Sequence, residues 1–129
     1  MLQAYLGEVK GTIFTEVSVG KHSTDAQTRR IDGVRVPSSA SEIKPLRGGH
    51  SEFERRAKGA IVEAIEAKGS LNRSVIGQAI VGKHLLEIEY GVAAAVPVVV
   101  CKKGDQLLQQ VCARLGVKVW TPGQRFVVP

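Results

Sequence analysis

In the second half of the chain, short apolar runs alternate with amphipathic helical patterns, and this order restricts the fold more than any other feature. The apolar run 97–101 has the length of a strand buried inside a parallel sheet. It lies between helical patterns at 72–90 and 105–115, and a last strand pattern covers 117–120. Strands that alternate with helices predict parallel neighbours joined by right-handed crossovers. Polar residues suited to helix N-caps precede both helical patterns: Asn72 or Ser74, and Asp105.

The segment 60–68, A-I-V-E-A-I-E-A-K, fits either a helix or a strand by periodicity alone. Three of its apolar residues, Ile61, Val62 and Ile65, are β-branched, and Gly69 follows it directly. Because β-branched residues are enriched in strands, we predict a strand here.

Two further strands are predicted near the start of the chain. Residues 12–19 are rich in β-branched side chains, and residues 30–36 alternate between apolar and polar, so a hairpin across the polar, turn-like segment 20–28 is expected. Residues 1–9 could form a short helix or a short strand. The sequence therefore predicts an α/β fold with a mixed β-sheet, in which an antiparallel hairpin lies beside a parallel β-α-β-α-β unit and helices flank the sheet.

The 129 residues suit one domain spanning 1–129, because a second compact domain would lack a core of its own. The segment at about 38–59 is the loosest part, with a proline, two adjacent glycines and many charges. Within it, Ser51 followed by Glu54 fits a capping box and predicts a helical turn or two. This segment could be a mobile loop or an ordered part of a partner interface.

The chain is basic, with a formal net charge of +6 and a pI near 9.6. This balance favours a polyanionic partner, because Lys and Arg gain Coulomb energy beside phosphates and release counterions. Many basic proteins bind nothing acidic, so the charge alone does not identify a nucleic-acid partner.

Several features indicate the cellular compartment. Cys101 and Cys112 do not form a CxxC pair and look like buried small hydrophobes, which suits a reducing cytoplasm. Residues 1–6 lack the basic region and long apolar core of a secretory signal. The longest apolar run, 92–101, is too short for a membrane span and contains Pro97. We therefore expect a cytoplasmic protein with no membrane partner.

Three charged residues in the predicted strands are candidates for a catalytic site. Asp32 lies within the strand 30–36, where a carboxylate costs stability unless it is paired, bound to a metal or facing solvent. Glu66 and Lys68 end the next strand, and because strand side chains alternate, both project from the same face. Taken singly, these residues also have simpler explanations. Asp32 could be an exposed residue on the polar face of a hairpin, and Glu66 and Lys68 could form a surface ion pair of little energetic value.

Together with a Gln on the next predicted helix, these residues resemble the PD-(D/E)xK nuclease superfamily. Members place an Asp on one core strand, Glu-x-Lys on the next, and often a Gln on the following helix. The matching residues are Asp32 in R-I-D-G-V, Glu66 and Lys68 in I-V-E-A-I-E-A-K, and Gln78 in S-V-I-G-Q-A-I-V-G. The resemblance covers roughly residues 12–101. It departs from the pattern in two respects: Ile31 replaces the Pro and Gly33 follows Asp32, and the gap from Asp32 to Glu66 is long. The long gap implies an insertion, which matches the segment at about 38–59. The resemblance implies a restriction-endonuclease-like or Holliday-junction-resolvase-like core.

The resemblance also implies a chemistry for these residues. Asp32 and Glu66 would bind Mg²⁺ or Mn²⁺ through carboxylate oxygens, and the ion would lower the pKa of a bound water and act as a Lewis acid on the phosphate. Lys68 would orient or deprotonate that water. Gln78 would place a neutral amide near the water or the scissile phosphate.

Members of the superfamily often add a Glu from an earlier element. Glu8 is the candidate if residues 1–9 are helical, and Glu16 is the candidate on the first strand. Either residue could also be a solvated surface glutamate.

Polar and basic residues near these positions are candidates for DNA contacts. Arginines bracket Asp32, and the helix that follows Lys68 begins with an N-terminus whose backbone N–H groups suit phosphate. Solubility is the alternative explanation for these charges. The candidates for DNA binding are Arg30, Arg35, Asn72 and Arg73.

We therefore predict a divalent-metal-dependent nuclease acting on DNA, either an endonuclease or an exonuclease, with junctions, forks and recombination intermediates among its candidate substrates. The alternative is a non-catalytic nucleic-acid-binding or assembly module on the same fold. A third interpretation, a small-ligand or regulatory fold, would leave the alignment of Asp32 with Glu66 as a coincidence. Because a single small domain usually needs a second subunit to cut both strands, we expect a homodimer or a higher homo-oligomer.

Overall fold

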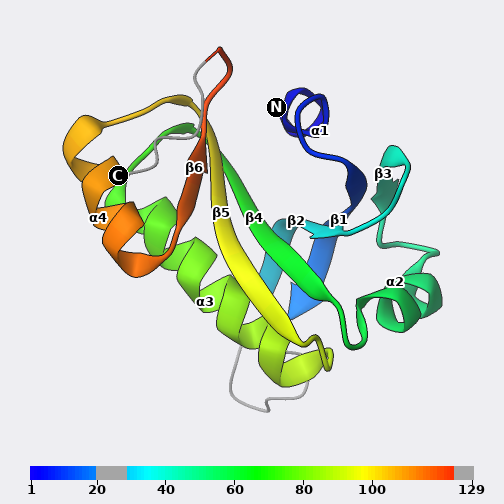
Figure 1. Ribbon diagram of the computed structural model, residues 1–129. Helices are drawn as coiled ribbons and strands as arrows, with labels where there is room; N and C mark the ends of the chain where they lie inside the picture. The colour runs from blue at the N-terminus through cyan, green and yellow to red at the C-terminus, as the bar shows by residue number, and fades with distance from the viewer. Residues whose placement is uncertain (20–28, 124–129) are drawn as a thin grey trace.

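The computed structural model describes residues 1–19 and 29–123, which form one six-stranded mixed sheet flanked by helices (Figure 1). The turn-like segment 20–28 lies outside the described residues. The elements in chain order are α1 (Leu2–Leu6), β1 (Gly11–Val19), β2 (Arg29–Val36), β3 (Ser41–Pro45), α2 (His50–Ala57), β4 (Ile61–Ser70), α3 (Arg73–Glu89), β5 (Ala94–Lys103), α4 (Gln106–Leu115) and β6 (Lys118–Trp120).

The strands lie in the order β3-β1-β2-β4-β5-β6. β1 and β2 form the expected antiparallel hairpin, with Thr12 beside Val36. β2 is antiparallel to β4, whereas β4, β5 and β6 are parallel to one another and are joined through α3 and α4. The predicted α/β class with a mixed sheet is confirmed, and the segment that fitted either a helix or a strand belongs to strand β4.

Apolar side chains pack on both faces of the sheet. On one face, α2 and α3 cover β1, β2 and β4, with the rings of Phe14 and Phe53 centred 5.1 Å apart, edge to face. The same face continues under α3 and α4, where Cys101 and Cys112 are both free and buried, as predicted. α1 packs on the opposite face through Tyr5. No helix within residues 1–19 and 29–123 is long and apolar enough to cross a membrane.

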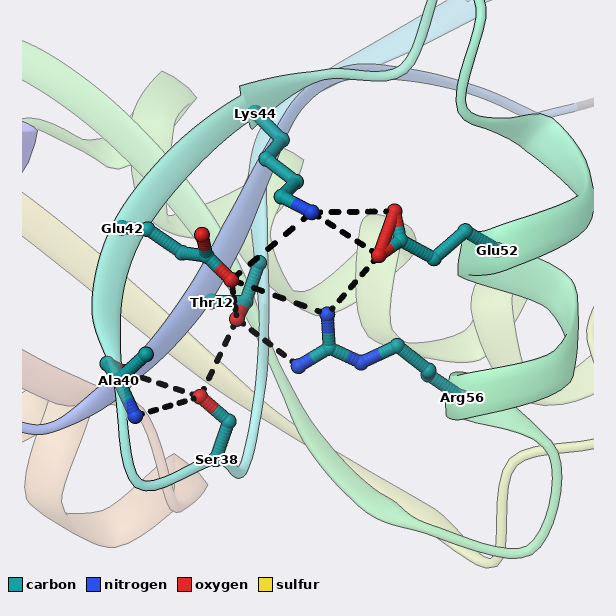
Figure 2. A network of polar contacts seen from close by, with 7 residues as sticks. All are labelled: Thr12, Ser38, Ala40, Glu42, Lys44, Glu52 and Arg56. Atoms are coloured by element: carbon teal, nitrogen blue, oxygen red, sulfur yellow. Dashed lines mark hydrogen bonds and ion pairs between the residues drawn. The ribbon is translucent and has the colours of Figure 1, made fainter.

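The segment 38–59 contains a strand that the sequence did not predict and a helix that it did. The predicted capping box is wrong, because Gly49 is the N-cap of the helix and Ser51 lies inside it. β3 pairs in parallel with β1 at one edge of the sheet. α2 follows, and a network of polar contacts ties both elements to β1 (Figure 2). In this network Arg56 donates to the Thr12 hydroxyl at 2.9 Å, and Lys44 and Arg56 pair with Glu52 at 2.9 and 3.4 Å.

The N-caps of α3 and α4 place both helix starts at one edge of the sheet. Asn72, one of the two predicted caps, accepts a hydrogen bond from the Val75 N–H at 2.8 Å. Asp105 caps α4 in the same way, accepting a backbone N–H of its first turn at 2.9 Å. Because β4 and β5 are parallel, with Ser70 beside Lys103, the two helices begin at their shared carboxyl edge.

The alternation of side chains along β2 is interrupted, so that the residues facing the helices shift by one position. Asp32 lies at this interruption. Ile31 and Val34 both belong to the cluster under α2 and α3, although strict alternation would place them on opposite faces. β1 changes in the same way around Glu16, whose φ of 55° lies in the left-handed region. Paired residues of β2 and β4 extend only to Gly33, so Asp32 lies just beyond the last pair.

Candidate active site

An open pocket of about 600 Å³ lies between the start of β2, the end of β4 and α3. Asp32, Glu66, Lys68 and Gln78 all line it, so the structure brings together the four residues predicted to be catalytic. Arg30, a predicted DNA contact, lines the pocket as well. The other lining residues are Val19, Arg29, Ile31, Gly77, Val81, Gly82 and Leu85.

β4 supplies Glu66 and Lys68 to this pocket, which agrees with their alternation along the strand. Glu66 is only 7% exposed, and its Oε1 atom lies 3.9 Å from the position that a Cβ on Gly82 would take. The glycine on α3 therefore leaves room for the carboxyl group beneath the helix. Lys68, two residues nearer the strand end, is exposed.

Asp32 reaches from β2 to β4 with its side chain. Its Oδ2 atom accepts a hydrogen bond from the backbone N–H of Ala67 at 2.9 Å. Ala67 is the residue between Glu66 and Lys68, so this bond fixes the Asp32 carboxylate beside both. A side chain thus continues the contact between the two strands at the point where their backbone pairing ends.

Asp32 is close enough to Glu66 to affect the ionisation of Glu66. The pKa of Glu66 is raised to about 8, first by burial and then by the charge of Asp32 and a hydrogen bond with it, while the Lys68 ammonium opposes this rise. Near neutral pH the metal-free protein therefore keeps a proton on this pair of carboxyl groups. A cation bound between them would displace that proton.

α3 forms an apolar wall beside the polar groups. Val81 is 45% exposed and, with Leu85, faces the pocket. A Cβ added at Gly77 would meet nothing within 4 Å, so the space next to Gln78 is open. Sequence analysis did not reveal this wall, because glycines and valines in a helix are more often explained by packing.

The two glutamates considered as additional ligands do not line the pocket. Glu8 lies near the end of α1, where its Oε2 atom accepts a hydrogen bond from the Trp120 indole N–H at 2.7 Å. Glu16 is opposite Asp32 in the strand register, but its exposed carboxylate makes an ion pair with Arg30 at 3.8 Å.

Arg35 also lies away from the pocket, in a buried network on the other face of β4 that sequence analysis did not reveal. Its Nε atom donates to Glu63 at 2.7 Å; Tyr5 donates to the same carboxylate at 2.7 Å and Lys118 at 3.4 Å. Burial alone would raise the pKa of Glu63, but hydrogen bonds from Arg35 and Tyr5 hold it below its ordinary value. Arg35 and Glu63 are direct neighbours in the β2–β4 register, so knowing this register would have predicted the pair.

Asn72 and Arg73 lie at the start of α3, outside the pocket lining. The side-chain oxygen of Asn72 is used as the helix cap, and its amide nitrogen donates to the Ser70 carbonyl at 3.4 Å. Arg73 is exposed and has no ion pair within 4 Å in the described part of the chain.

The carboxylate oxygens of the pocket suit a hard divalent cation, which two such ligands would bind with modest affinity. Residues 1–19 and 29–123 contain no group of three or more His, Cys, Asp or Glu side chains that could hold a metal. Asp32 and Glu66 therefore offer two carboxylates, and waters or substrate oxygens would complete the coordination. Mg²⁺ is often bound in this way, through one or two carboxylates together with waters and phosphate.

Comparisons with known proteins give no family assignment. No protein-family model, curated protein or solved structure matches the chain. The interpretation of the pocket therefore depends on its chemistry and on the arrangement of the strands around it.

Proposed function

We propose that this protein is a nuclease that hydrolyses phosphodiester bonds in DNA and depends on Mg²⁺ or Mn²⁺. The observation that carries the proposal is the convergence of Asp32 and Glu66 in one open pocket with Lys68 and Gln78. The two carboxylates can hold the metal ion that such hydrolysis uses, and the space between them and α3 is large enough for part of a nucleotide.

The strand arrangement supports the same proposal. An antiparallel hairpin, β1 and β2, lies next to β4, and α3 then leads to the parallel strand β5. This is the order expected for a restriction-endonuclease-like core of the PD-(D/E)xK superfamily, with β3 and α2 as additions between β2 and β4. Asp32 and Glu66 lie on the adjacent strands β2 and β4, as in the pattern of that superfamily.

Asp32 and Glu66 would hold the metal ion. When bound, the ion supplies a water of lowered pKa and a Lewis acid for the phosphate. The Ala67 N–H orients the Asp32 carboxylate, so the charge that binds the cation is already in place. Lys68 balances negative charge on the substrate and can accept or donate a proton at its Nζ atom. The Gln78 amide orients polar groups, and the apolar wall of α3 restricts water around them.

Cleavage assays with paired variants test the proposal. Labelled single-stranded, duplex and branched DNA is incubated with the protein and Mg²⁺ or Mn²⁺, and EDTA should abolish cutting. Asp32→Asn and Glu66→Gln should each lower the rate by about a hundredfold or more. Glu54→Gln, an equal charge change on exposed α2, is the control. Wild-type cleavage rates in both site variants would contradict the catalytic assignment. A closed circular DNA substrate, which only an endonuclease can cut, distinguishes endonuclease from exonuclease activity.

A non-catalytic nucleic-acid-binding module is the second candidate. The described lining of the pocket contains two carboxylates beside three cations, Arg29, Arg30 and Lys68, and this excess of positive charge favours nucleic-acid binding over other non-enzymatic functions. It predicts salt-sensitive DNA binding, no cutting with either ion, and full binding by Asp32→Asn. Assembly as a homodimer or higher oligomer is proposed for either function, and analytical ultracentrifugation at micromolar concentration tests it.

A further inference from the structure

Four basic residues lie close along the backbone where β4 and β5 end and α3 begins. By strand alternation Lys103 is on the face of the sheet that carries α3, and Lys102 is on the other face, so the two lysines cover both sides of this edge. Lys68 is beside Cys101 in the register and Ser70 is beside Lys103, so the two strand ends are in contact. The Leu71 N–H donates to the Lys103 carbonyl at 2.9 Å, which brings the start of α3 to the same place. We call these exposed residues the carboxyl-edge patch: Lys68, Arg73, Lys102 and Lys103.

Three of the four positive charges of the patch, all except that of Lys68, are not neutralised by the rest of the described chain. Arg73, Lys102 and Lys103 have no ion pair within 4 Å among the residues that the structure describes. Asp105 follows in the sequence, but its carboxylate accepts a backbone N–H to cap α4. By contrast, the lysine and arginine of the network in Figure 2 are paired with glutamates. Cations grouped without acids favour binding of a polyanion.

The start of α3 adds to the positive potential of this edge. Its cap is the neutral Asn72 and its first turn contains no acidic residue, whereas the start of α4 is capped by the Asp105 carboxylate. Helix N-termini carry partial positive charge that favours phosphate. Lys68 belongs both to the patch and to the pocket, so the two are continuous.

We propose that the carboxyl-edge patch binds the phosphodiester backbone of a nucleic-acid strand that runs through the pocket. The strand enters beside Arg29 and Arg30 on β2, passes the carboxyl groups, and leaves across the ends of β4 and β5. Its path past a cleavage point rests on the proposed nuclease function. Its attachment to the patch is a binding event that does not require cleavage.

The double variant Lys102→Gln/Lys103→Gln tests the attachment. Binding to fluorescent single-stranded and duplex DNA of one sequence is measured by anisotropy in EDTA over a series of salt concentrations. Each lost phosphate contact lowers the slope of log K against log salt by about 0.7 for single strands and 0.9 for duplex. The double variant should therefore lower the slope by roughly 1.4–1.8 and, with affinity near 1 M salt unchanged, weaken binding about 25- to 60-fold near 0.1 M salt. The form of DNA that shows this change is the form that the patch binds.

The matched control is Arg55→Gln/Lys58→Gln, which removes the same charge from the C-terminal end of α2, ahead of the opposite end of β4. Hydrolysis of bis(p-nitrophenyl) phosphate with Mn²⁺ is measured in parallel, since this small diester can enter the pocket without reaching Lys102 or Lys103. The proposal expects normal hydrolysis and weakened DNA binding in the patch variant.

Two results would overturn the patch: a DNA affinity and salt slope equal to those of the control, or a parallel loss of diester hydrolysis, which would show a disturbed pocket. Failure of the nuclease proposal looks different. In that case the wild type hydrolyses neither DNA nor the small diester, while the patch variant still weakens DNA binding.

Discussion

The carboxylate of Asp32 accepts a hydrogen bond from the backbone N–H of Ala67 at 2.9 Å. The bond joins β2 to β4 through a side chain, directly after the last paired residues of the two strands. It holds one carboxyl group against another, that of Glu66, which is 7% exposed. The geometry of the site therefore depends on an acceptor at position 32, whereas its electrostatics depend on the charge there.

Asp32→Asn separates these two roles, because an asparagine oxygen can still accept the Ala67 N–H. Loss of the negative charge should lower the pKa of Glu66 from about 8 in the metal-free protein, while burial, its largest cause, continues to act. Carbon-13 NMR titration of the Glu66 carboxyl in EDTA measures the shift. An unchanged or higher pKa in the variant would show that Asp32 does not act on Glu66.

Glu66→Gln should stabilise the metal-free protein at alkaline pH. An acid whose pKa is raised on folding from 4.5 to about 8 holds its proton more tightly when folded, so stability falls as the pH rises between these values. The variant should exceed the wild type in free energy of unfolding by roughly 1–4 kcal/mol at about pH 9, with little gain at about pH 4. Urea unfolding in EDTA gives both values. Saturating Mn²⁺ should reduce or reverse the gain, because the ion stabilises only the wild-type site.

Arg35→Leu should destabilise the fold by about 3–5 kcal/mol, since it leaves the Glu63 carboxylate buried without its main partner. Glu63→Leu in the same chain should recover much of this loss. The lowered pKa of Glu63 means that its contribution is complete above about 4.5 and is lost as the pH falls through the folded value. Glu63→Gln should therefore lack part of the acid-induced loss of stability seen in the wild type, as measured by thermal unfolding at several pH values.

The elements that could be predicted are those specified by local pattern. β-Branched residues identified β4 as a strand, and alternation along it placed Glu66 and Lys68 on one face. The N-caps Asn72 and Asp105 each accept a hydrogen bond from a residue three positions later. A short stretch of sequence contains both partners, so these caps could be predicted.

The features that could not be predicted depend on contacts between distant parts of the chain. β3 reads S-E-I-K-P, and it becomes a strand because β1 offers it an unpaired edge. Glu8 hydrogen-bonds to the Trp120 indole, which is 112 positions away in the sequence. Because a local pattern does not contain this partner, Glu8 remained a candidate metal ligand in the sequence analysis. Arg35 faces away from the pocket because β2 does not keep a strict alternation of side chains: Ile31 and Val34 both face the helices. A prediction from simple alternation cannot include this irregularity.

Arg56→Leu should loosen the attachment of β3 and α2 to β1. The guanidinium donates to the buried Thr12 hydroxyl at 2.9 Å and lies 5.7 Å from the centre of the Phe14 ring. Its loss should cost about 1–2 kcal/mol and speed amide hydrogen exchange in residues 38–59. Arg55→Leu, one position earlier on the exposed side of α2, is the control. Equal exchange in both variants would mean that the network in Figure 2 does not hold this segment.

Substitutions of Gly77 should block the pocket without weakening the fold. Gly77 lies within α3 and lines the pocket beside Gln78, and a Cβ there would meet nothing within 4 Å. Replacing a helical glycine raises helix propensity by up to about 1 kcal/mol, so Gly77→Ala and Gly77→Leu should unfold at or above the wild-type temperature. Cleavage of DNA should fall in proportion to side-chain size, slightly for Ala and by about tenfold or more for Leu, because the larger side chain fills the space that the substrate needs. The matched control is Ser74→Leu, an exposed position one turn earlier on the same helix but outside the pocket lining. A stable Gly77→Leu protein that cuts DNA as fast as Ser74→Leu would show that the substrate does not use this pocket.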